Sequence, residues 1–261
     1  MPIMACSFYD NGPSKQMDFP LKDPLKRQSG SGPSPCAACT VRDWVFCSVL
    51  SEHELSRLDE MATHLDLSAK ETIFNEGDEA KHLFNVTEGL VKLYKLLPDG
   101  REQVTGFLFA GDFLGIAMND TYAYSAETTQ PVKICRFKRS DLEQMFREIP
   151  KLENRMLNMA TNELVQAQDQ LLLLGRKTAK ERLCTFLLSL SKRADKRGDS
   201  PTLVSVPMSR ESIGDYLGLT TETVSRTFSK LKKENVLSLN KGGIVELHNL
   251  DDLMGLAEDS T

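Results

Sequence analysis

The segment of residues 209–234 constrains the fold more than any other part of the chain. Ser209 is a favourable N-cap residue, and the pattern after it predicts a short helix over 210–217. Gly218 interrupts this pattern, and a second helix is predicted over 221–234. A helix, a short turn containing glycine and a second helix form the helix-turn-helix arrangement. The apolar residues expected to hold its helices together are Ile213, Leu217, Leu219, Val224 and Phe228.

The second predicted helix carries side chains suited to reading DNA. Glu222, Ser225 and Arg226 lie at positions i, i+3 and i+4 near its N-terminal end, so they share one face. In a major groove, Arg contacts guanine, Glu accepts from cytosine, and Ser serves either partner. We therefore predict that these three side chains read bases. The predicted phosphate contacts are Thr220, Thr221, Lys230 and Lys232.

The residues around this motif predict a wing. The pattern indicates a helix over 179–191, a strand over 203–206 and a hairpin over 236–247. Residues 176–241 contain 14 Lys and Arg against 7 Asp and Glu, although the whole chain has a net charge of −5. This basic region indicates a polyanionic partner. A small helical domain with a solvated charged face is the alternative.

Evenly spaced turn signals divide residues 64–142. Gly77, Gly89, Gly100 and Gly111 recur every 11 or 12 residues and separate short apolar runs. Such spacing is typical of an antiparallel β-sandwich or barrel, because each turn reverses the direction of the chain. We therefore predict a β-roll here, with an unrelated α+β domain as the alternative.

A long amphipathic helix is predicted from Pro150 to about Gly175. Its apolar residues recur at spacings of three to five and fall near one face. Such a stripe often belongs to an ordinary core, but a long helix between two domains has surface to offer a second copy of the chain. We predict a homodimer with the seam residues Leu152, Met156, Met159, Leu164, Ala167, Leu171 and Leu174.

Three of the six cysteines fall within twelve residues. Cys36, Cys39 and Cys47 follow Pro35 in a loop-like stretch, with gaps of two and seven residues. A four-cysteine zinc ribbon needs a second cysteine pair about 15–20 residues further on, and the sequence has none. Three clustered thiols and a distant fourth favour an iron–sulfur cluster, because thiolates are soft ligands. Ordinary buried thiols are the alternative, and Cys184 is expected to be one.

The remaining features exclude several classes of protein. Residues 1–35, which contain Cys6, are rich in Pro, Gly and Ser and predict a flexible arm. No apolar run approaches the roughly 20 residues of a membrane span, and the start of the chain lacks a secretory signal pattern. We therefore expect no membrane association, a cytoplasmic location and reduced thiols. No nucleophile–base pair or phosphate-binding loop is evident, so we expect no enzyme activity.

The chain resembles the Crp/Fnr superfamily of bacterial transcription regulators over about residues 36–250. Glu222, Ser225 and Arg226 are similar to the Fnr branch, whereas the cyclic-AMP receptor branch has an Arg where this chain has Thr221. The other matching motifs are residues 104–107, 110–112, 169–174, 181–183 and 213–220.

This resemblance implies an α+β fold. The family combines an N-terminal antiparallel β-roll, a cyclic-nucleotide-binding-like jelly roll, with a long dimerisation helix and a C-terminal winged helix-turn-helix. The corresponding divisions are the arm (residues 1–35), the cysteine-rich loop (36–50), the roll (51–147), the dimerisation helix (148–176) and the DNA-binding domain (177–261). The implied DNA site is a palindrome of TTGAT-like half-sites. Contact with RNA polymerase is implied for Val104, Thr105, Gly106 and Phe107.

The resemblance also implies a set of metal ligands. Fnr-type oxygen sensors use an N-terminal cysteine trio and one cysteine past the middle of the roll, where Cys135 stands here. The implied ligands of a [4Fe–4S] cluster are Cys36, Cys39, Cys47 and Cys135. We expect an oxygen-responsive regulator that is active as a dimer when the cluster is present and controls anaerobic or microaerobic genes. A winged-helix regulator controlled by thiol oxidation or another ligand is the alternative.

Other family ligands and the helix seam refine these expectations. Residues 115–125 contain no arginine to pair with a phosphate, so cyclic AMP is disfavoured. The four histidines are scattered and expected at the surface, which gives no evident haem site.

Family members can place an acidic residue in the seam, where this chain has Ala167. Repulsion between these acidic residues of the two chains holds the cluster-free form monomeric. In this chain either Glu163 or Asp169 supplies the repulsion, or the chain dimerises more readily without its cluster.

Overall fold

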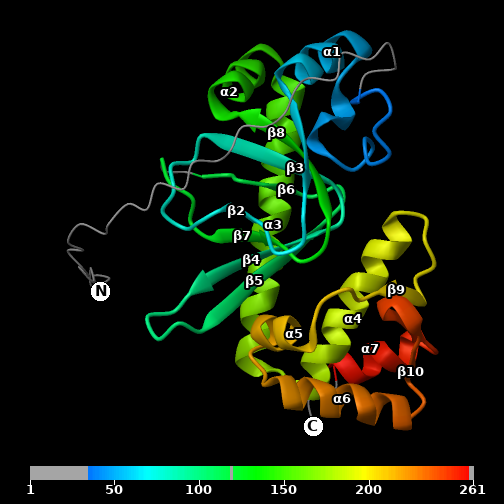
Figure 1. The fold of residues 1–261 in the computed structure, drawn as a ribbon. Helices are drawn as coiled ribbons and strands as arrows, with labels where there is room; N and C mark the ends of the chain where they lie inside the picture. The colour runs from blue at the N-terminus through cyan, green and yellow to red at the C-terminus, as the bar shows by residue number, and fades with distance from the viewer. Residues whose placement is uncertain (1–34, 118–119, 259–261) are drawn as a thin grey trace, which may run out of the picture. The chain divides into compact units, whose positions relative to one another are not determined.

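The computed structural model describes residues 35–117 and 120–258 (Figure 1). Apart from Pro35, the predicted arm of residues 1–35 lies outside the described residues, and so does Cys6. Within the described ranges, no helix has the length and hydrophobicity that crossing a membrane requires.

Antiparallel strands form the predicted β-roll, which is confirmed. The strands pair into two four-stranded sheets with the orders β1-β8-β3-β6 and β2-β7-β4-β5. The two sheets share an apolar core, in which Val86, Val91 and Ile134 are at most 1 % exposed. The strands are β1 (Thr63–Leu67), β2 (Thr72–Phe74), β3 (His82–Glu88), β4 (Leu90–Leu96), β5 (Glu102–Phe109), β6 (Phe113–Leu114), β7 (Ser125–Thr128) and β8 (Val132–Lys138).

The four evenly spaced glycines adopt conformations suited to turns, as their spacing predicts. Their φ angles lie between 84° and 95°, a region that other residues rarely adopt. At Gly89, between β3 and β4, a Cβ atom would also lie 2.5 Å from the Pro131 carbonyl oxygen. A side chain there would therefore push this turn away from the loop that leads into β8.

Three helices beside the roll were not expected from the sequence pattern. The 3-10 helix η1 (Phe46–Val49) and helix α1 (Glu52–Met61) precede β1, and α2 (Arg139–Glu148) follows β8. A capping box starts α1: the Ser51 hydroxyl accepts from the Glu54 backbone, and the Glu54 carboxylate accepts from the Ser51 backbone at 2.7 Å. This pair is the sequence signal that identifies α1.

The predicted long helix is α3 (Pro150–Arg176), which is uninterrupted (Figure 1). Its predicted seam residues divide into two groups, because the ends of the helix contact the cores of its own chain. The residues that pack against those cores are Leu152, Met156, Met159 and Leu174. The exposed residues are Leu164, Ala167 and Leu171. The structure therefore narrows the predicted partner surface to the middle and later turns of α3.

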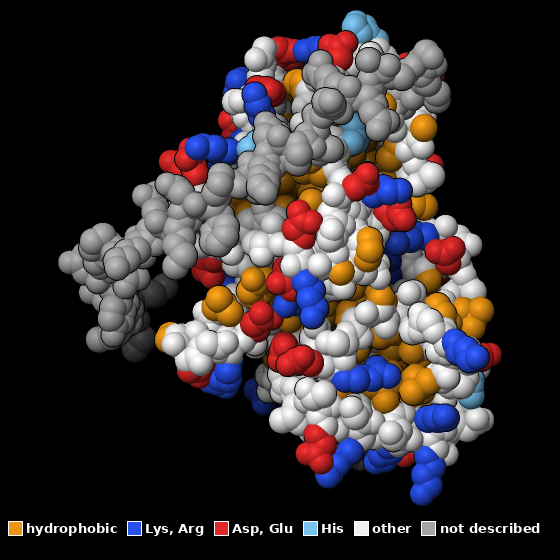
Figure 2. All heavy atoms as spheres, viewed as in Figure 1, with side chains coloured by type: hydrophobic (Ala, Val, Ile, Leu, Met, Phe, Trp, Pro, Cys, Tyr) orange, Lys and Arg blue, Asp and Glu red, His pale blue; other side chains and the backbone are white. Residues whose placement is uncertain are grey.

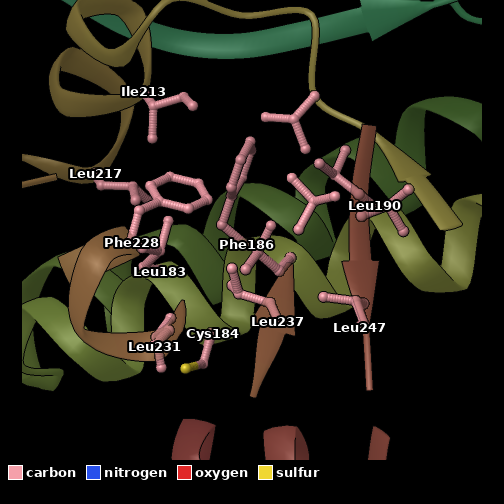
Figure 3. Close-up of a cluster of buried hydrophobic side chains, with 14 of the residues drawn as sticks. Leu183, Cys184, Phe186, Leu190, Ile213, Leu217, Phe228, Leu231, Leu237 and Leu247 are labelled. Carbon is pink, nitrogen blue, oxygen red and sulfur yellow. The ribbon is translucent and has the colours of Figure 1, made fainter. Parts of the chain in front are cut away.

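The C-terminal part of the chain confirms the predicted winged helix-turn-helix. Its strands form a three-stranded sheet with the order β10-β11-β9. In the shared core, Phe186 from α4, Leu217 from α5 and Phe228 from α6 are at most 4 % exposed (Figure 3). Helix α4 continues past its predicted end at residue 191, and α7 was not expected. The elements are α4 (Ala179–Lys196), β9 (Leu203–Ser205), α5 (Arg210–Leu217), α6 (Thr221–Lys233), β10 (Leu237–Leu239), η2 (Lys241–Gly243), β11 (Ile244–Leu247) and α7 (Leu250–Glu258).

Candidate functional site

All four predicted metal ligands line one cavity of about 390 Å³. Cys36, Cys39 and Cys47 come from the loop that precedes α1, and Cys135 comes from β8. Cys39 is half-buried, and the other three cysteines are buried. Because Cys135 follows Cys47 by 88 residues, only the folded chain brings the four thiols together.

Three neighbouring strands form one wall of this cavity. Cys135 of β8 is paired in register with His64 of β1 and with Asn85 of β3. Residues paired in this way point to the same face of a sheet, so the three side chains lie in a row. All three line the cavity. The Nδ1 atom of His64 lies 3.4 Å from the sulfur of Cys135.

The cysteine loop, residues 36–50, is attached to the roll near one end and to α1 near the other. The buried ring of Phe46 meets the rings of Phe113 and Phe137 edge to face, with centroids 5.2 and 5.6 Å apart. At the other end, the backbone N–H of Cys36 donates to Oδ1 of Asp59 in α1 at 3.3 Å. These contacts keep the loop beside β8.

Burial changes the acid–base behaviour of the thiols. Desolvation raises the pKa of Cys47 to about 11 and the pKa of Cys135 to about 12. The pKa of Cys36 is raised further, first by burial and then by a hydrogen bond with Asp59. These three thiols are therefore protonated at neutral pH, and a metal that binds them as thiolates must displace their protons.

The sequence analysis missed three polar residues around the thiols: Asp59, His64 and Asn85. His64 is exposed, as expected, but it also contacts Cys135, and its Nε2 lies 3.2 Å from Oδ1 of Asp59. Asn85 is 2 % exposed, and its Oδ1 has no hydrogen-bond partner among the described residues. Strand register brings His64 and Asn85 to Cys135, and neither stands in a local motif that could have identified it.

Trp44 connects the cysteine loop with two other parts of the chain. The guanidinium of Arg197, the C-cap residue of α4, lies 5.7 Å from the centre of the Trp44 ring. The same guanidinium donates to the backbone oxygen of Ala110. The backbone oxygen of Trp44 accepts from Nη2 of Arg155 in α3 at 3.4 Å. The loop that carries three thiols therefore contacts both the long helix and the DNA-binding domain.

The helix-turn-helix depends on a close approach at Gly214. A Cβ atom there would lie 2.6 Å from the backbone oxygen of Leu219, in the turn between the helices. Gly218 ends α5, and its N–H donates to the Gly214 oxygen. Thr220 then caps α6, because its hydroxyl accepts from the Thr223 backbone at 3.1 Å. These contacts fix the direction in which α6 leaves the turn.

The predicted base-reading residues form an exposed face at the N-terminal end of α6. Glu222, Ser225 and Arg226 are all exposed. The Arg226 and Glu222 side chains, 78 % and 69 % exposed, form an ion pair of 2.6 Å. An ion pair this exposed is weak, so both side chains can turn toward DNA at little cost. The predicted phosphate contacts are also exposed: Thr220, Thr221, Lys230 and Lys232. Figure 2 shows Lys and Arg gathered at the bottom of the view, where α6 lies.

The four predicted RNA polymerase contacts lie on β5, and Thr105 is the exposed one. Val104 is 1 % exposed, and Gly106 is half-buried. The ring of Phe107 lies 5.3 Å from that of Tyr216 in the DNA-binding domain. The register between β4 and β5 shifts at Thr105, and the four residues differ in burial, so they do not form one exposed surface. Thr105 is therefore the one residue of the predicted RNA polymerase set that is exposed to a partner.

Aromatic rings fill part of the interior of the roll. Phe74 stacks on Tyr122 with ring centroids 3.7 Å apart and lies 5.8 Å from Phe84. The Tyr122 hydroxyl donates to the backbone oxygen of His82 at 2.7 Å. These rings offer no positive charge to a phosphate, which agrees with the arginine-free stretch of residues 115–125.

A β-roll, a long helix and an exposed recognition helix on a winged helix-turn-helix define a two-domain transcription regulator that binds DNA. Two family models match the corresponding parts of the chain. Residues 64–148 match the cyclic nucleotide-binding domain, and residues 181–256 match the Crp-like helix-turn-helix domain.

Curated relatives cover most of the chain. The nitrogen fixation regulation protein FixK of Bradyrhizobium diazoefficiens is 40% identical over 80% of this chain and 88% of its own length. The fumarate and nitrate reduction regulatory protein of Escherichia coli is 35% identical over 92% of this chain and 97% of its own length. The solved structure of FixK2 from Bradyrhizobium japonicum has a TM-score of 0.71 at 36% identity, covering 77% of this chain and 99% of that one.

The chain belongs to the Crp/Fnr family of transcription regulators. Regulators of this family bind DNA and act as dimers. The names of the relatives describe regulators rather than enzymes, as the sequence predicts.

Proposed function

We propose that this protein is an oxygen-responsive transcription regulator that binds DNA as a dimer when its four clustered thiols hold a [4Fe–4S] cluster. The ligands are Cys36, Cys39, Cys47 and Cys135. The observation that carries the proposal is the meeting of these thiols in one cavity. Similarity to the fumarate and nitrate reduction regulatory protein supports it. The targets are palindromic TTGAT-type sites of anaerobic or microaerobic genes, which the protein meets in the cytoplasm.

The donor set suits a cluster better than a single zinc ion. One zinc ion would draw four sulfurs to about 2.3 Å from a common centre. Among the described residues, however, the donor atoms that gather within 4.8 Å of one another belong to Cys36, Asp59 and His64, with no second thiol. Thiols spread around a cavity suit a group that offers each of them its own iron atom.

An unsatisfied polar atom in the cavity supports the same assignment. Asn85 is almost fully buried, and a buried amide oxygen without a partner is costly. Turning the amide over would direct its N–H donors to the same place. The sulfur atoms of a cluster, or of its thiolate ligands, would accept those hydrogen bonds.

The residues of the chain would pass the state of the cavity to the DNA-binding domain. When bound, the cluster supplies metal–sulfur bonds that join the loop to β8 and that reaction with oxygen removes. Phe46 keeps the loop beside the roll, and Trp44 touches Arg155 of α3 and Arg197 of α4. A change in loop position would therefore favour one arrangement of these helices over another.

The DNA-binding part of the proposal rests on the exposed face of α6. In a dimer, two such helices about 34 Å apart would enter successive major grooves. Glu222, Ser225 and Arg226 would contact bases, while Lys230 and Lys232 would contact phosphates. Contact with RNA polymerase would use Thr105, the exposed member of its predicted set.

The test is metal and sulfide analysis of protein purified without oxygen. We expect about four iron and four sulfide per chain, a visible spectrum that bleaches in air, and DNA binding that falls with it. Cys39→Ser and Cys135→Ser should lose the iron. Cys6→Ser and Cys184→Ala serve as controls and should keep it, because Cys184 lies in the core of the DNA-binding domain (Figure 3).

One result would overturn the proposal. In that result, metal analysis finds zinc or no metal, and DNA binding is equal before and after exposure to air. That outcome would leave a winged-helix regulator controlled by thiol oxidation or by another ligand.

A further inference from the structure

One group of donor atoms beside the cavity differs from the four-thiol set. The donor atoms of Cys36, Asp59 and His64 all lie within 4.8 Å of one another. They come from three different elements: the cysteine loop, α1 and β1. Cys36 is buried, Asp59 is half-buried and His64 is exposed, so the group opens toward solvent.

The chemistry of this group is that of a site for one metal ion. Zinc takes thiolate, imidazole and carboxylate ligands at about 2.0–2.3 Å, and four such donors complete its coordination. The Nε2 atom of His64 is already 3.2 Å from Oδ1 of Asp59. Two atoms bound to the same zinc ion lie at about this separation, so little movement is needed to place an ion between them.

Hydrogen bonds around the group hold its donors in place. The second ring nitrogen of His64 lies 3.4 Å from the Cys135 sulfur, and the backbone N–H of Cys36 donates to Asp59. A histidine that binds a metal through one nitrogen commonly forms a hydrogen bond through the other, which sets the orientation of the ring. Cys135 would serve as that partner without being a ligand.

We propose that Cys36, Asp59 and His64 form a site for a single zinc-type divalent cation in the cluster-free protein, with water as the fourth ligand. The site itself does not depend on the cluster. Its consequence rests on the proposed function: because Cys36 belongs to both sets, an ion and a cluster exclude each other. Zinc would therefore retain the protein in its cluster-free state.

The two ligand sets can be separated by mutation. Cys39 and Cys47 belong to the cluster set alone, and Asp59 and His64 belong to the ion set alone. The experiment titrates Zn²⁺ into cluster-free, reduced full-length protein without oxygen, in competition with a chromophoric chelator. Co²⁺ serves as a second probe, because its absorption spectrum reports a bound thiolate and the coordination geometry.

We expect one ion per chain in the wild type. His64→Gln and Asp59→Asn should weaken binding by more than the roughly 10- to 100-fold that follows loss of a group hydrogen-bonded to a metal ligand. The double variant Cys39→Ser/Cys47→Ser should bind Zn²⁺ as the wild type does. His64 is exposed, so His64→Gln should keep the fold, and circular dichroism and the melting temperature verify this for each variant.

Two results would overturn this site. The first is unchanged Zn²⁺ affinity in a folded His64→Gln variant. The second is loss of binding in Cys39→Ser/Cys47→Ser, which would indicate zinc held by the thiols instead. Reconstitution of His64→Gln with iron and sulfide provides a separate readout: a cluster should form there and resist added Zn²⁺, whereas in the wild type Zn²⁺ should block its assembly. If no cluster forms in the wild type while Zn²⁺ binds as described, the proposed function fails and the ion site stands.

Discussion

Arg226 stands at the N-terminal end of α6 with its charge paired to an exposed neighbouring carboxylate. We expect Arg226→Ala to cost about 1–3 kcal/mol in binding to a preferred half-site and to relax the preference at one base pair. The measurement is titration of a set of half-sites that differ at single positions. Lys232→Ala is the control: it should weaken binding to all sequences alike and reduce the salt dependence by about one charge. Equal losses on every sequence for Arg226→Ala would contradict its base-reading role.

Glu54 predicts a pH dependence of stability. The ion pair with Lys151 at 2.6 Å and the hydrogen bonds with Ser51 lower the pKa of Glu54 to about 2. The unfolded chain has a Glu pKa of about 4.3, so this stabilisation is present above that pH and is lost as the pH falls toward 2. In cluster-free protein, Glu54→Gln should therefore lower the melting temperature at pH 7, and the difference from the wild type should shrink between about pH 4 and 2.

The control for this effect is Glu60→Gln, an exposed residue of the same helix that forms neither contact. It should change the melting temperature little at either pH. A Glu54→Gln difference that stays constant from pH 7 to pH 2 would show that the carboxylate charge has no part in the stabilisation.

At the scale of elements, α3 presents an apolar stripe that no described residue of its own chain covers. Leu157, Leu164 and Leu171 recur every seven residues and are 63%, 59% and 72% exposed. Val165 and Leu172 lie alongside them and are also exposed. Helical periodicity places Glu163 outside this stripe, whereas Asp169 follows Val165 by four residues and therefore borders the stripe beside Val165 and Leu172. Asp169 is therefore the acidic residue placed to act at the seam, while the five exposed apolar side chains favour dimerisation without the cluster.

We expect the cluster-free protein to be a dimer in sedimentation equilibrium. Leu164→Asp should raise the dimer dissociation constant more than roughly 100-fold, because it would bury unpaired carboxylates at the seam. Gln166→Asp adds the same charge to an exposed position on the opposite side of the helix and should leave the dimer intact. A monomeric cluster-free wild type would contradict this prediction.

The elements differ in how far the sequence determines them. Residues 210–217 and 221–234 were predicted almost to the residue, because Ser209, Gly218 and Thr220 mark the helix ends by local capping. Helices α1, α2 and α7 were missed. Each is short, ten residues or fewer, so its apolar period repeats too few times to stand out. Which face of α3 meets its own chain was not predictable either, because tertiary packing decides it.

At the scale of the whole molecule, Trp44 predicts coupling between the cavity and the DNA-binding domain. We expect Trp44→Ala to keep its iron and its spectrum but to lose part of the difference in DNA affinity between the cluster-bound and cluster-free states. A cation–π contact is worth about 1–2 kcal/mol when partly buried, so the ratio of the two affinities should fall roughly 5- to 30-fold. Paired DNA titrations, before and after exposure to air, measure this ratio.

Asp43→Ala is the matched control, since Asp43 is the exposed neighbour of Trp44 in the same loop. It should leave the ratio unchanged. If Trp44→Ala binds DNA with the wild-type ratio, the loop must communicate with the DNA-binding domain by another route.

Only part of the candidate site could be predicted from the sequence. The family resemblance identified the four thiols, since they stand in recognisable places along the chain. Asp59, His64 and Asn85 could not be found in this way, because they reach the cavity through the pairing of β1, β3 and β8. Strand register depends on the whole sheet and is not contained in any short stretch of sequence.

The position of Cys135 also affects how the protein is made. A ribosome adds about 5–20 residues per second, so Cys135 is synthesised roughly 4–18 s after Cys47. Even then, Cys135 reaches its place only when β8 inserts between β1 and β3. The complete set of thiols therefore exists only in a chain whose central sheet has formed. A newly made chain with an incomplete sheet would not present all four thiols and would not receive a cluster. Cofactor insertion would therefore select correctly folded chains.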